Sequence, residues 1–240
     1  MRKLRLADLD VVLGGGPDRE GGGSGPLLLL LHGYGAPGDD LVPLARQLPV
    51  DRAVRFAFPA APLRLDPGLP PEHSGRAWWQ LDMVELQRAV MRGDYETLMK
   101  RVPAGLTEAR EQVLKLLAAL QTEHQLTPEK LVLGGFSQGA MLAIDVTLHA
   151  AQRPAGLVIL SGSLICKDAW QPQLTKLLGL PVLQSHGRQD PILSYSIAEK
   201  LRDELLAAGA ALEFFPFNGG HGIPGSILDA LGKLLDGVTG

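Results

Sequence analysis

One serine of the chain lies in the pattern Gly-x-Ser-x-Gly, formed by Gly135, Ser137 and Gly139. The apolar residues 131–133 before it predict a buried strand, and the residues from Ala140 onward predict a helix. A serine on a tight turn between a strand and a helix is lifted clear of the sheet, and the helix start supplies amide donors for an oxyanion. The pattern predicts that Ser137 is a nucleophile; the alternative is a structural serine in a glycine-rich turn.

A serine hydroxyl needs an adjacent general base, which an acid in turn orients. In the nucleophile-elbow arrangement the chain order is serine, acid, histidine, so the base must follow Ser137. His221 fits, because it lies among glycines in the loop 218–222, after an expected strand and before the last expected helix. His186 is interpreted as a residue that shapes its own loop, and His149 falls at the far end of an expected helix. We therefore predict His221 as the general base.

The acid of this arrangement should follow a strand and precede His221 in the sequence. Asp190 meets both conditions, since it comes shortly after an apolar run at 181–184. Asp168 follows the previous expected strand and is the rival, whereas Asp145 falls in the middle of a predicted helix and is interpreted as structural. Asp190 is the predicted acid.

The oxyanion formed during acyl transfer requires two hydrogen-bond donors. One is expected from the backbone N–H of Gln138, which follows the nucleophile, and the other from a loop after an early strand. The segment 31–35, Leu-His-Gly-Tyr-Gly, follows an apolar run, and its glycines allow the backbone to turn inward. We predict the N–H of Tyr34 as the second donor, with Gly33 as the alternative, and a structural role for His32.

The elements that must position these residues alternate between short apolar runs and helical patterns. That alternation predicts an α/β fold with a mostly parallel central sheet and helices on both faces. Neither an internal repeat nor an interdomain linker is visible, so we expect one domain over residues 1–240. Strands are expected at 9–13, 27–31, 53–58, 131–133, 157–160, 181–184 and 212–215, and helices at 106–121, 140–151, 192–208 and 227–235.

A segment at about residues 62–105 departs from this alternation. It is rich in proline at first and then predicts a helix over 84–101. Three methionines in it are spaced by eight residues and drift slowly around one side of such a helix. Ordinary packing of an inserted helix explains this, and so does a short cover segment that lines an adaptable apolar pocket. The residues expected in the substrate pocket are Trp78, Trp79, Met83 and Ile223.

The composition excludes several other classes of function. The 240 residues are 45% hydrophobic and 20% charged with a formal net charge of −3, which does not favour a nucleic-acid partner. The single cysteine, Cys166, allows neither an internal disulfide nor a thiolate-rich zinc site. The longest apolar run, 27–31, is too short to span a bilayer, and no secretory leader is visible. The glycine-rich loop 14–26 lacks the Gly-Lys-Ser/Thr ending of a phosphate loop. We expect a cytoplasmic protein without metal or cofactor. The sequence does not decide between a monomer and a homodimer.

Three motifs resemble one family closely: Leu-His-Gly-Tyr-Gly at 31–35, Gly-Phe-Ser-Gln-Gly at 135–139 and His-Gly-x-x-Asp-Pro at 186–191. They are similar to the carboxylesterase/phospholipase family of α/β-hydrolases, which includes acyl-protein thioesterases and lysophospholipases. The resemblance extends from about residue 27 to 227. It implies the α/β-hydrolase fold, no metal, and hydrolysis of carboxylic esters or thioesters. It also implies the triad Ser137, Asp190 and His221 and an oxyanion hole at Tyr34 and Gln138.

The chain departs from the family pattern at a few positions near the expected site. The family often has leucine at the position of Tyr34 and serine at the position of Gly222, and its usual Trp-Phe-Asp run is replaced by the sequence at 78–82. These departures favour a serine carboxylesterase that acts on esters of small to medium acyl chains. The alternatives are an acyl-protein thioesterase or lysophospholipase, a lactone-opening hydrolase, which usually has a cysteine nucleophile, and a hydrolase-fold binding module without catalysis.

Overall fold

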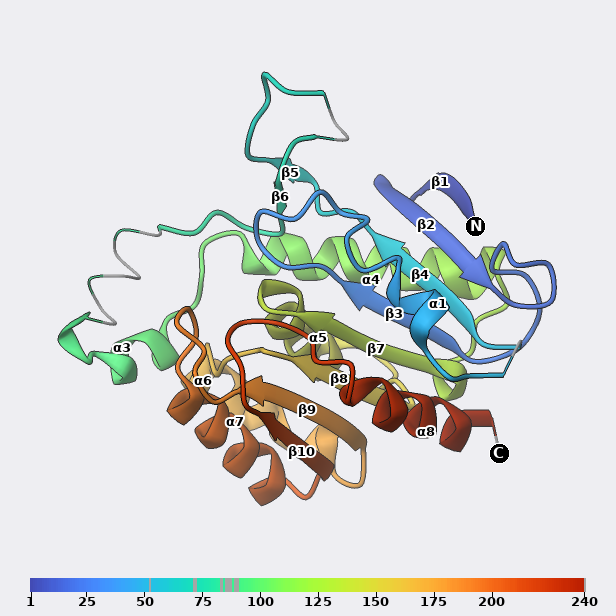
Figure 1. Ribbon diagram of the computed structural model, residues 1–240. Helices are drawn as coiled ribbons and strands as arrows, with labels where there is room; N and C mark the ends of the chain where they lie inside the picture. The colour runs from blue at the N-terminus through green and yellow to red at the C-terminus, as the bar shows by residue number, and fades with distance from the viewer. Residues whose placement is uncertain (52, 71–72, 83, 85–87, 89–90, 240) are drawn as a thin grey trace.

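The structure is a computed structural model that describes residues 1–51, 53–70, 73–82, 84, 88 and 91–239 (Figure 1). Its strands are β1 (Arg2–Leu6), β2 (Leu9–Gly15), β3 (Leu27–Leu31), β4 (Arg55–Pro59), β5 (Leu63–Arg64), β6 (Arg76–Ala77), β7 (Leu131–Phe136), β8 (Gly156–Leu160), β9 (Pro181–Gly187) and β10 (Ala211–Phe217). Its helices are α1 (Leu44–Gln47), α3 (Tyr95–Lys100), α4 (Leu106–Glu123), α5 (Gln138–His149), α6 (Lys167–Trp170), α7 (Tyr195–Ala207) and α8 (Ile227–Thr239), with the 3-10 helices η1 (Pro128–Lys130) and η2 (Gln171–Leu177).

The central sheet has eight strands in the order β1-β2-β4-β3-β7-β8-β9-β10. The pairs β1/β2 and β2/β4 are antiparallel, and every other neighbouring pair is parallel. The carboxyl ends of β3, β7 and β9 therefore meet at one edge of the sheet, where ligands bind in open α/β folds. The predicted mostly parallel sheet is confirmed.

Two layers of helices cover the sheet, as Figure 1 shows. All five leucines of β3 are at most 1% exposed, and successive side chains point to opposite faces. Leu29 belongs to a hydrophobic cluster with α4, α5 and α7, whereas Leu28 belongs to a second cluster with α8. Burial of each such leucine contributes about 1.5–3 kcal/mol to folding, so β3 fixes both layers against the sheet.

The predicted elements occur where the sequence placed them, with shifted ends. β7 continues beyond residue 133 to Phe136, and β9 continues beyond residue 184 to Gly187, so His186 lies in a strand and not in a loop as predicted. α5 begins at Gln138 and α7 at Tyr195. β1 was not predicted, because its charged, mostly exposed residues give no apolar run.

The segment 62–105 lies outside the regular alternation of the fold. β5 and β6 form a two-stranded hairpin that projects from the body (Figure 1). The single helix predicted over 84–101 is wrong, because the chain turns at Gly93, whose φ is 67°, and α3 starts anew after its N-cap Asp94. Residues 85–87 and 89–90 lie outside the described residues. Among the described helices, none is long and apolar enough to cross a bilayer.

Candidate active site

Ser137 lies on the turn between β7 and α5, and its backbone is in a conformation that non-glycine residues seldom adopt. Its φ is 55° and its ψ is −117°. The amide of Ser137 donates to Leu160 O at 2.9 Å, and the Ser137 carbonyl accepts from the amides of Ala140 and Met141 in the first turn of α5. A conformation of this kind costs about 1–3 kcal/mol and persists only where the surroundings hold it. The strand and the helix hold Ser137 in this way.

Glycine is required on both sides of Ser137 because the backbones approach so closely. A Cβ on Gly135 would lie 2.3 Å from the carbonyl carbon of Gly139, and a Cβ on Gly139 would lie 2.0 Å from Leu31 O. β3, β7 and α5 are therefore in backbone contact at the elbow. A Cβ on Gly33 would lie 3.3 Å from Cβ of Ser137, so the loop after β3 lies directly beside the serine.

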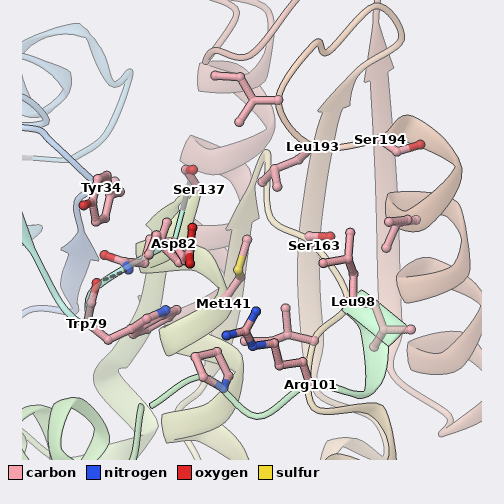
Figure 2. Close-up of a pocket in the computed structure, with 18 of the residues that line it drawn as sticks. Tyr34, Trp79, Asp82, Leu98, Arg101, Ser137, Met141, Ser163, Leu193 and Ser194 are labelled. Atoms are coloured by element: carbon pink, nitrogen blue, oxygen red, sulfur yellow. Dashed lines mark hydrogen bonds between the residues drawn. The ribbon is translucent and has the colours of Figure 1, made fainter. Parts of the chain in front are cut away.

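Two backbone amides beside the serine are available as donors. The N–H of Gln138 starts α5 and has no acceptor within the helix. Among the described residues, no acceptor bonds the N–H of Tyr34 either. The loop that carries Tyr34 is fixed to β6, since the amide of Gly35 donates to Arg76 O at 2.9 Å and the amide of Arg76 donates to Ala36 O at 2.9 Å. Figure 2 shows Tyr34 on the same side of the cavity as Ser137.

His32 orients the peptide that contains the N–H of Tyr34. Its Nε2 accepts from the amide of Ala61 at 2.9 Å, so Nδ1 carries the hydrogen and donates to Gly33 O at 2.8 Å. In a trans peptide the C=O and the N–H point in opposite directions, so holding Gly33 O also fixes the direction of the Tyr34 N–H. Burial lowers the pKa of His32 to about 4, which keeps the ring neutral at neutral pH.

His221 and Asp190 are joined by a short hydrogen bond. Nδ1 of His221 lies 2.7 Å from Oδ2 of Asp190, whose side chain is fully buried. Burial by itself raises the pKa of Asp190, but hydrogen bonds to the carboxylate outweigh it and hold that pKa well below its usual value. The carboxylate is therefore charged at neutral pH and accepts the Nδ1–H, so in the neutral tautomer of His221 the acceptor nitrogen is Nε2. The carboxylate accepts from Nδ1 of His221 and from the amides of Ile192 and Leu193, and Nε2 of His186 lies 3.2 Å from Oδ2.

The loops that carry Asp190 and His221 contact each other at glycines. A Cβ on Gly187 would lie 2.2 Å from Gly220 O, and the amide of Gln189 donates to Gly219 O at 3.0 Å. The ring of His221 lies 4.9 Å from that of Phe136, the residue before the serine, measured between centroids. These contacts bring His221 and Ser137 to the same end of the sheet.

Ser161 is not among the site residues that the sequence predicts, yet it holds the chain beside His221. It follows β8, has a φ of 48°, and its hydroxyl donates to Gly222 O at 2.9 Å. It is also fully buried. The signal in the sequence that could have indicated it is its position immediately after a buried parallel strand, at the same edge as Ser137 and Asp190.

A cavity of about 560 Å³ opens beside Ser137 and His221. Its wall is largely apolar, with polar groups at Ser137 and at Asp82 and Arg101 (Figure 2). Part of the wall comes from α5, part from the chain after β9, and part from residues within the segment 62–105. Its apolar lining residues include Trp79, Leu98, Met141, Leu164, Ile192 and Leu193.

The residues predicted for the pocket divide into three groups. Trp79 lines the cavity. Trp78 does not, because its side chain packs against the loop after β3, where its indole N–H donates to His32 O at 3.0 Å. Ile223 packs against the cluster under α8 and is also not a lining residue. Met83 lies outside the described residues.

The side chain of Gln138 connects the elbow to the segment that covers the cavity. Its Oε1 accepts from the amide of Trp78 at 3.0 Å, and its Nε2 donates to Trp79 O at 2.9 Å. The side chain is 1% exposed, so both bonds are shielded from water. The side chain of Gln138 therefore fixes the backbone of Trp78 and Trp79 in addition to the backbone N–H that the sequence indicated. The sequence alone did not indicate this second role.

Other candidate groups are separated from the cavity or chemically unsuited to it. Asp168 is an exposed residue in the first turn of α6, and Asp145 is buried in an ion pair with Arg110 at 3.1 Å. Burial raises the pKa of the Cys166 thiol to about 12, so it is not a thiolate at neutral pH. Within the described residues, no cluster of three or more His, Cys, Asp or Glu could hold a metal ion.

The strand order and the elbow after β7 define an α/β-hydrolase fold. The chain belongs to the phospholipase/carboxylesterase family, whose sequence profile matches residues 22–238. The acyl-protein thioesterase 1 of Kluyveromyces lactis is 30% identical over 175 residues, 70% of each chain. That of Mycosarcoma maydis is 27% identical over 215 residues, 79% of this chain and 81% of the relative. The crystal structure of esterase PE8 matches with a TM-score of 0.75 and 25% identity, and covers 96% of this chain and 99% of that one.

Proposed function

We propose that this hydrolase is a serine carboxylesterase that cleaves esters of small to medium acyl chains through an acyl-enzyme. In this proposal Ser137 is the nucleophile, His221 the general base and Asp190 the acid that orients it. The amides of Tyr34 and Gln138 form the oxyanion hole. The whole chain acts as one catalytic domain, with the segment at about 62–105 as the cover over an apolar acyl site.

The observation that carries the proposal is the bond from His221 to Asp190. Because Nδ1 of His221 donates to the charged Asp190 at 2.7 Å, Nε2 is free to accept the proton of the Ser137 hydroxyl. That hydroxyl is displayed on a strained turn beside two amide donors, in the wall of the cavity that also contains the histidine. No other serine among the described residues combines such a turn, a buried His–Asp pair and a cavity.

The reaction follows in two steps. As Ser137 attacks the ester carbonyl, its proton passes to His221, and the carbonyl oxygen becomes an oxyanion that the amides of Tyr34 and Gln138 stabilise. The imidazolium of His221, held by Asp190, then gives the proton to the leaving alcohol. Water repeats the sequence on the acyl-enzyme and releases the acid.

A thioester substrate is the second candidate. The relatives reported above are acyl-protein thioesterases, and the attack on a thioester uses the same groups. The apolar wall formed by side chains such as Met141 and Leu164 suits the acyl chain in both cases. The difference lies in the leaving group, so the two candidates separate by rate on matched substrates and not by the triad.

The test compares the wild type with Ser137→Ala on p-nitrophenyl esters from acetate to palmitate, beside an acyl-CoA and a lysophospholipid. We expect kcat to fall about 10³-fold or more in this variant. Ser163→Ala is the matched control, because Ser163 is another serine that lines the same cavity; it should stay within about threefold of the wild type. If Ser137→Ala kept most of the activity, the proposed mechanism would be wrong. A wild type that binds esters without turnover would instead indicate a binding module.

A further inference from the structure

His186 is a buried histidine that touches the acid of the proposed triad. It lies in β9, four residues before Asp190, and is 0% exposed. Its Nε2 is 3.2 Å from Oδ2 of Asp190 and 2.9 Å from Leu193 O. Both partners are acceptors, so the hydrogen of the ring is on Nε2. It bonds Leu193 O, and Oδ2 of Asp190 lies within reach of the same nitrogen.

The other ring nitrogen indicates that His186 is neutral. Nδ1 has no hydrogen-bond partner within the described part of the chain, and neither has Oε1 of Gln184, two residues earlier on the same face of β9. A neutral ring leaves only an unfilled acceptor there, whereas a protonated ring would leave a buried N–H unpaired, which is more costly. The other titratable or charged groups near the ring are Tyr195 on α7, with centroids 6.3 Å apart, and Arg188, which lies over Tyr195.

The two histidines share one carboxylate oxygen. Oδ2 of Asp190 accepts from Nδ1 of His221 at 2.7 Å and lies 3.2 Å from Nε2 of His186, while Oδ1 accepts from the amides of Ile192 and Leu193. Without His186, Oδ2 would be held by His221 alone. The carboxylate would then rotate more freely, and more of its charge would act on His221.

We propose that His186 is a positioning residue of the triad: its Nε2–H fixes the carboxylate of Asp190 and moderates the pull of that carboxylate on His221. His186 does not touch the substrate, and its effect passes through Asp190. The inference rests on the function proposed above. The same N–H bonds Leu193 O, so His186 also joins the acid to a stretch of the cavity wall, Ile192 and Leu193.

The first experiment compares His186→Met with His186→Gln by the pH profile of kcat/KM on p-nitrophenyl butyrate. Methionine fills a similar volume without a donor, whereas glutamine can place an N–H near the position of Nε2. We expect His186→Met to lose about 10- to 100-fold in kcat/KM, as loss of a positioning contact does. Its acidic limb should move to higher pH, because Asp190 then holds the proton on His221 more strongly. His186→Gln should keep the limb and stay within about threefold.

The second experiment repeats His186→Met in an Asp190→Asn background. If His186 acts through the carboxylate, the substitution changes kcat/KM there by less than about twofold, because coupled residues are not additive. A merely structural role predicts the same loss in both backgrounds, and this result would overturn the proposal. So would a His186→Met enzyme with the pH profile of the wild type.

Correct folding is checked by circular dichroism and by titration of Ser137 with a fluorophosphonate. If His186→Met does not fold, His186→Asn replaces it, because its amide is polar but too short to reach Asp190. We expect that variant to show the same shift of the acidic limb; an unchanged limb would overturn the proposal. The proposed function fails separately, namely if Ser137→Ala retains the activity of the wild type.

Discussion

The carboxyl ends of the parallel strands and their amino ends both combine glycine with buried polar groups, but in different ways. At the carboxyl ends, the amides of Tyr34 and Gln138 lie beside a cavity, and Ser137 and Ser161 adopt positive φ immediately after their strands. At the amino ends, Arg55 donates from the start of β4 to two carbonyl oxygens of the chain itself, Gly25 O at 2.9 Å and His124 O at 2.8 Å.

The difference is that polar groups at one end of the sheet lie beside a cavity, whereas those at the other end hold parts of the chain together. Arg55 joins the glycine-rich loop 14–26 to the end of α4, where His124 is the cap and a cation is favoured by the helix dipole. Gly25 is needed there, since its Cβ would lie 2.0 Å from Ala53 O. Nε and Nη1 of Arg55 donate to the chain itself, whereas the amides of Tyr34 and Gln138 at the other end lie beside a cavity. Substitutions at the carboxyl ends should therefore change catalysis, and those at the amino ends should change stability alone.

The largest effect is expected from Asp190→Asn. An amide cannot stabilise the imidazolium and favours the wrong tautomer of His221, so kcat/KM should fall about 10⁴-fold. Asp168→Asn is the matched control, because Asp168 is the exposed aspartate after the previous strand, and it should leave kcat/KM unchanged. A loss below about tenfold for Asp190→Asn, or a large loss for the control, would contradict the assignment of the acid.

A glycine of the elbow should show the next largest effect, this time on stability. Gly139→Ala places a Cβ 2.0 Å from Leu31 O, and backbone cannot yield as a side chain can. We expect the free energy of unfolding to fall by about 3 kcal/mol or more. Gly222→Ala is the control beside His221, where a Cβ meets nothing within 4 Å; it should stay within about 0.5 kcal/mol. If the two variants were equally stable in urea, Gly139 would not lie as close to Leu31 O as the structure shows.

Protonation of His32 should make stability depend on pH in a defined window. Its pKa is lowered by burial from 6.5 to about 4, so the unfolded chain binds more protons between these values. The stability that the neutral ring contributes is complete above pH 6.5 and is lost as the pH falls towards 4, by about 3 kcal/mol in total.

Urea unfolding of the wild type and His32→Gln between pH 5 and 7 measures this contribution. Asp190 is charged in both the folded and the unfolded chain in that range, so its lowered pKa adds little slope. The difference in slope between the two proteins therefore belongs to His32. Parallel curves for the two proteins would mean that His32 does not titrate as its burial requires.

The smallest effect is expected at the amino ends of the strands. Arg55→Met removes the donors to Gly25 O and His124 O and should lower the free energy of unfolding by about 1–3 kcal/mol. Arg46→Met, at an exposed arginine of α1, is the control for loss of charge. We expect kcat/KM of folded Arg55→Met to equal that of the wild type. A loss of activity in proportion to stability would break the separation between the two ends of the sheet.

The sequence predicted the parts of the site that depend on chain order. An apolar run before the glycines indicated β7, and the order serine, aspartate, histidine after successive strands indicated Ser137, Asp190 and His221. It did not predict that β9 continues to Gly187, because Gln184, Ser185 and His186 are polar and nevertheless fully buried. Their burial depends on neighbouring strands and α7, which the local pattern does not encode.

The pocket was the least predictable part, for a geometric reason. Trp78 and Trp79 are adjacent, so their side chains take different directions, and the sequence does not say which one faces the substrate. The structure separates them through the bonds of Gln138 and His32. Gly134 likewise has a role that only the structure shows: a Cβ there would lie 2.6 Å from Cβ of Val158 on β8, so packing of the strands requires glycine.

The most direct test of the central claim is the site of covalent labelling by a fluorophosphonate probe. We predict one adduct per chain, located on Ser137 by peptide mass spectrometry. Labelling should be absent in Ser137→Ala, much slower in His221→Ala and unchanged in Ser163→Ala. An adduct on another residue, or a folded wild type that is not labelled at all, would contradict the account.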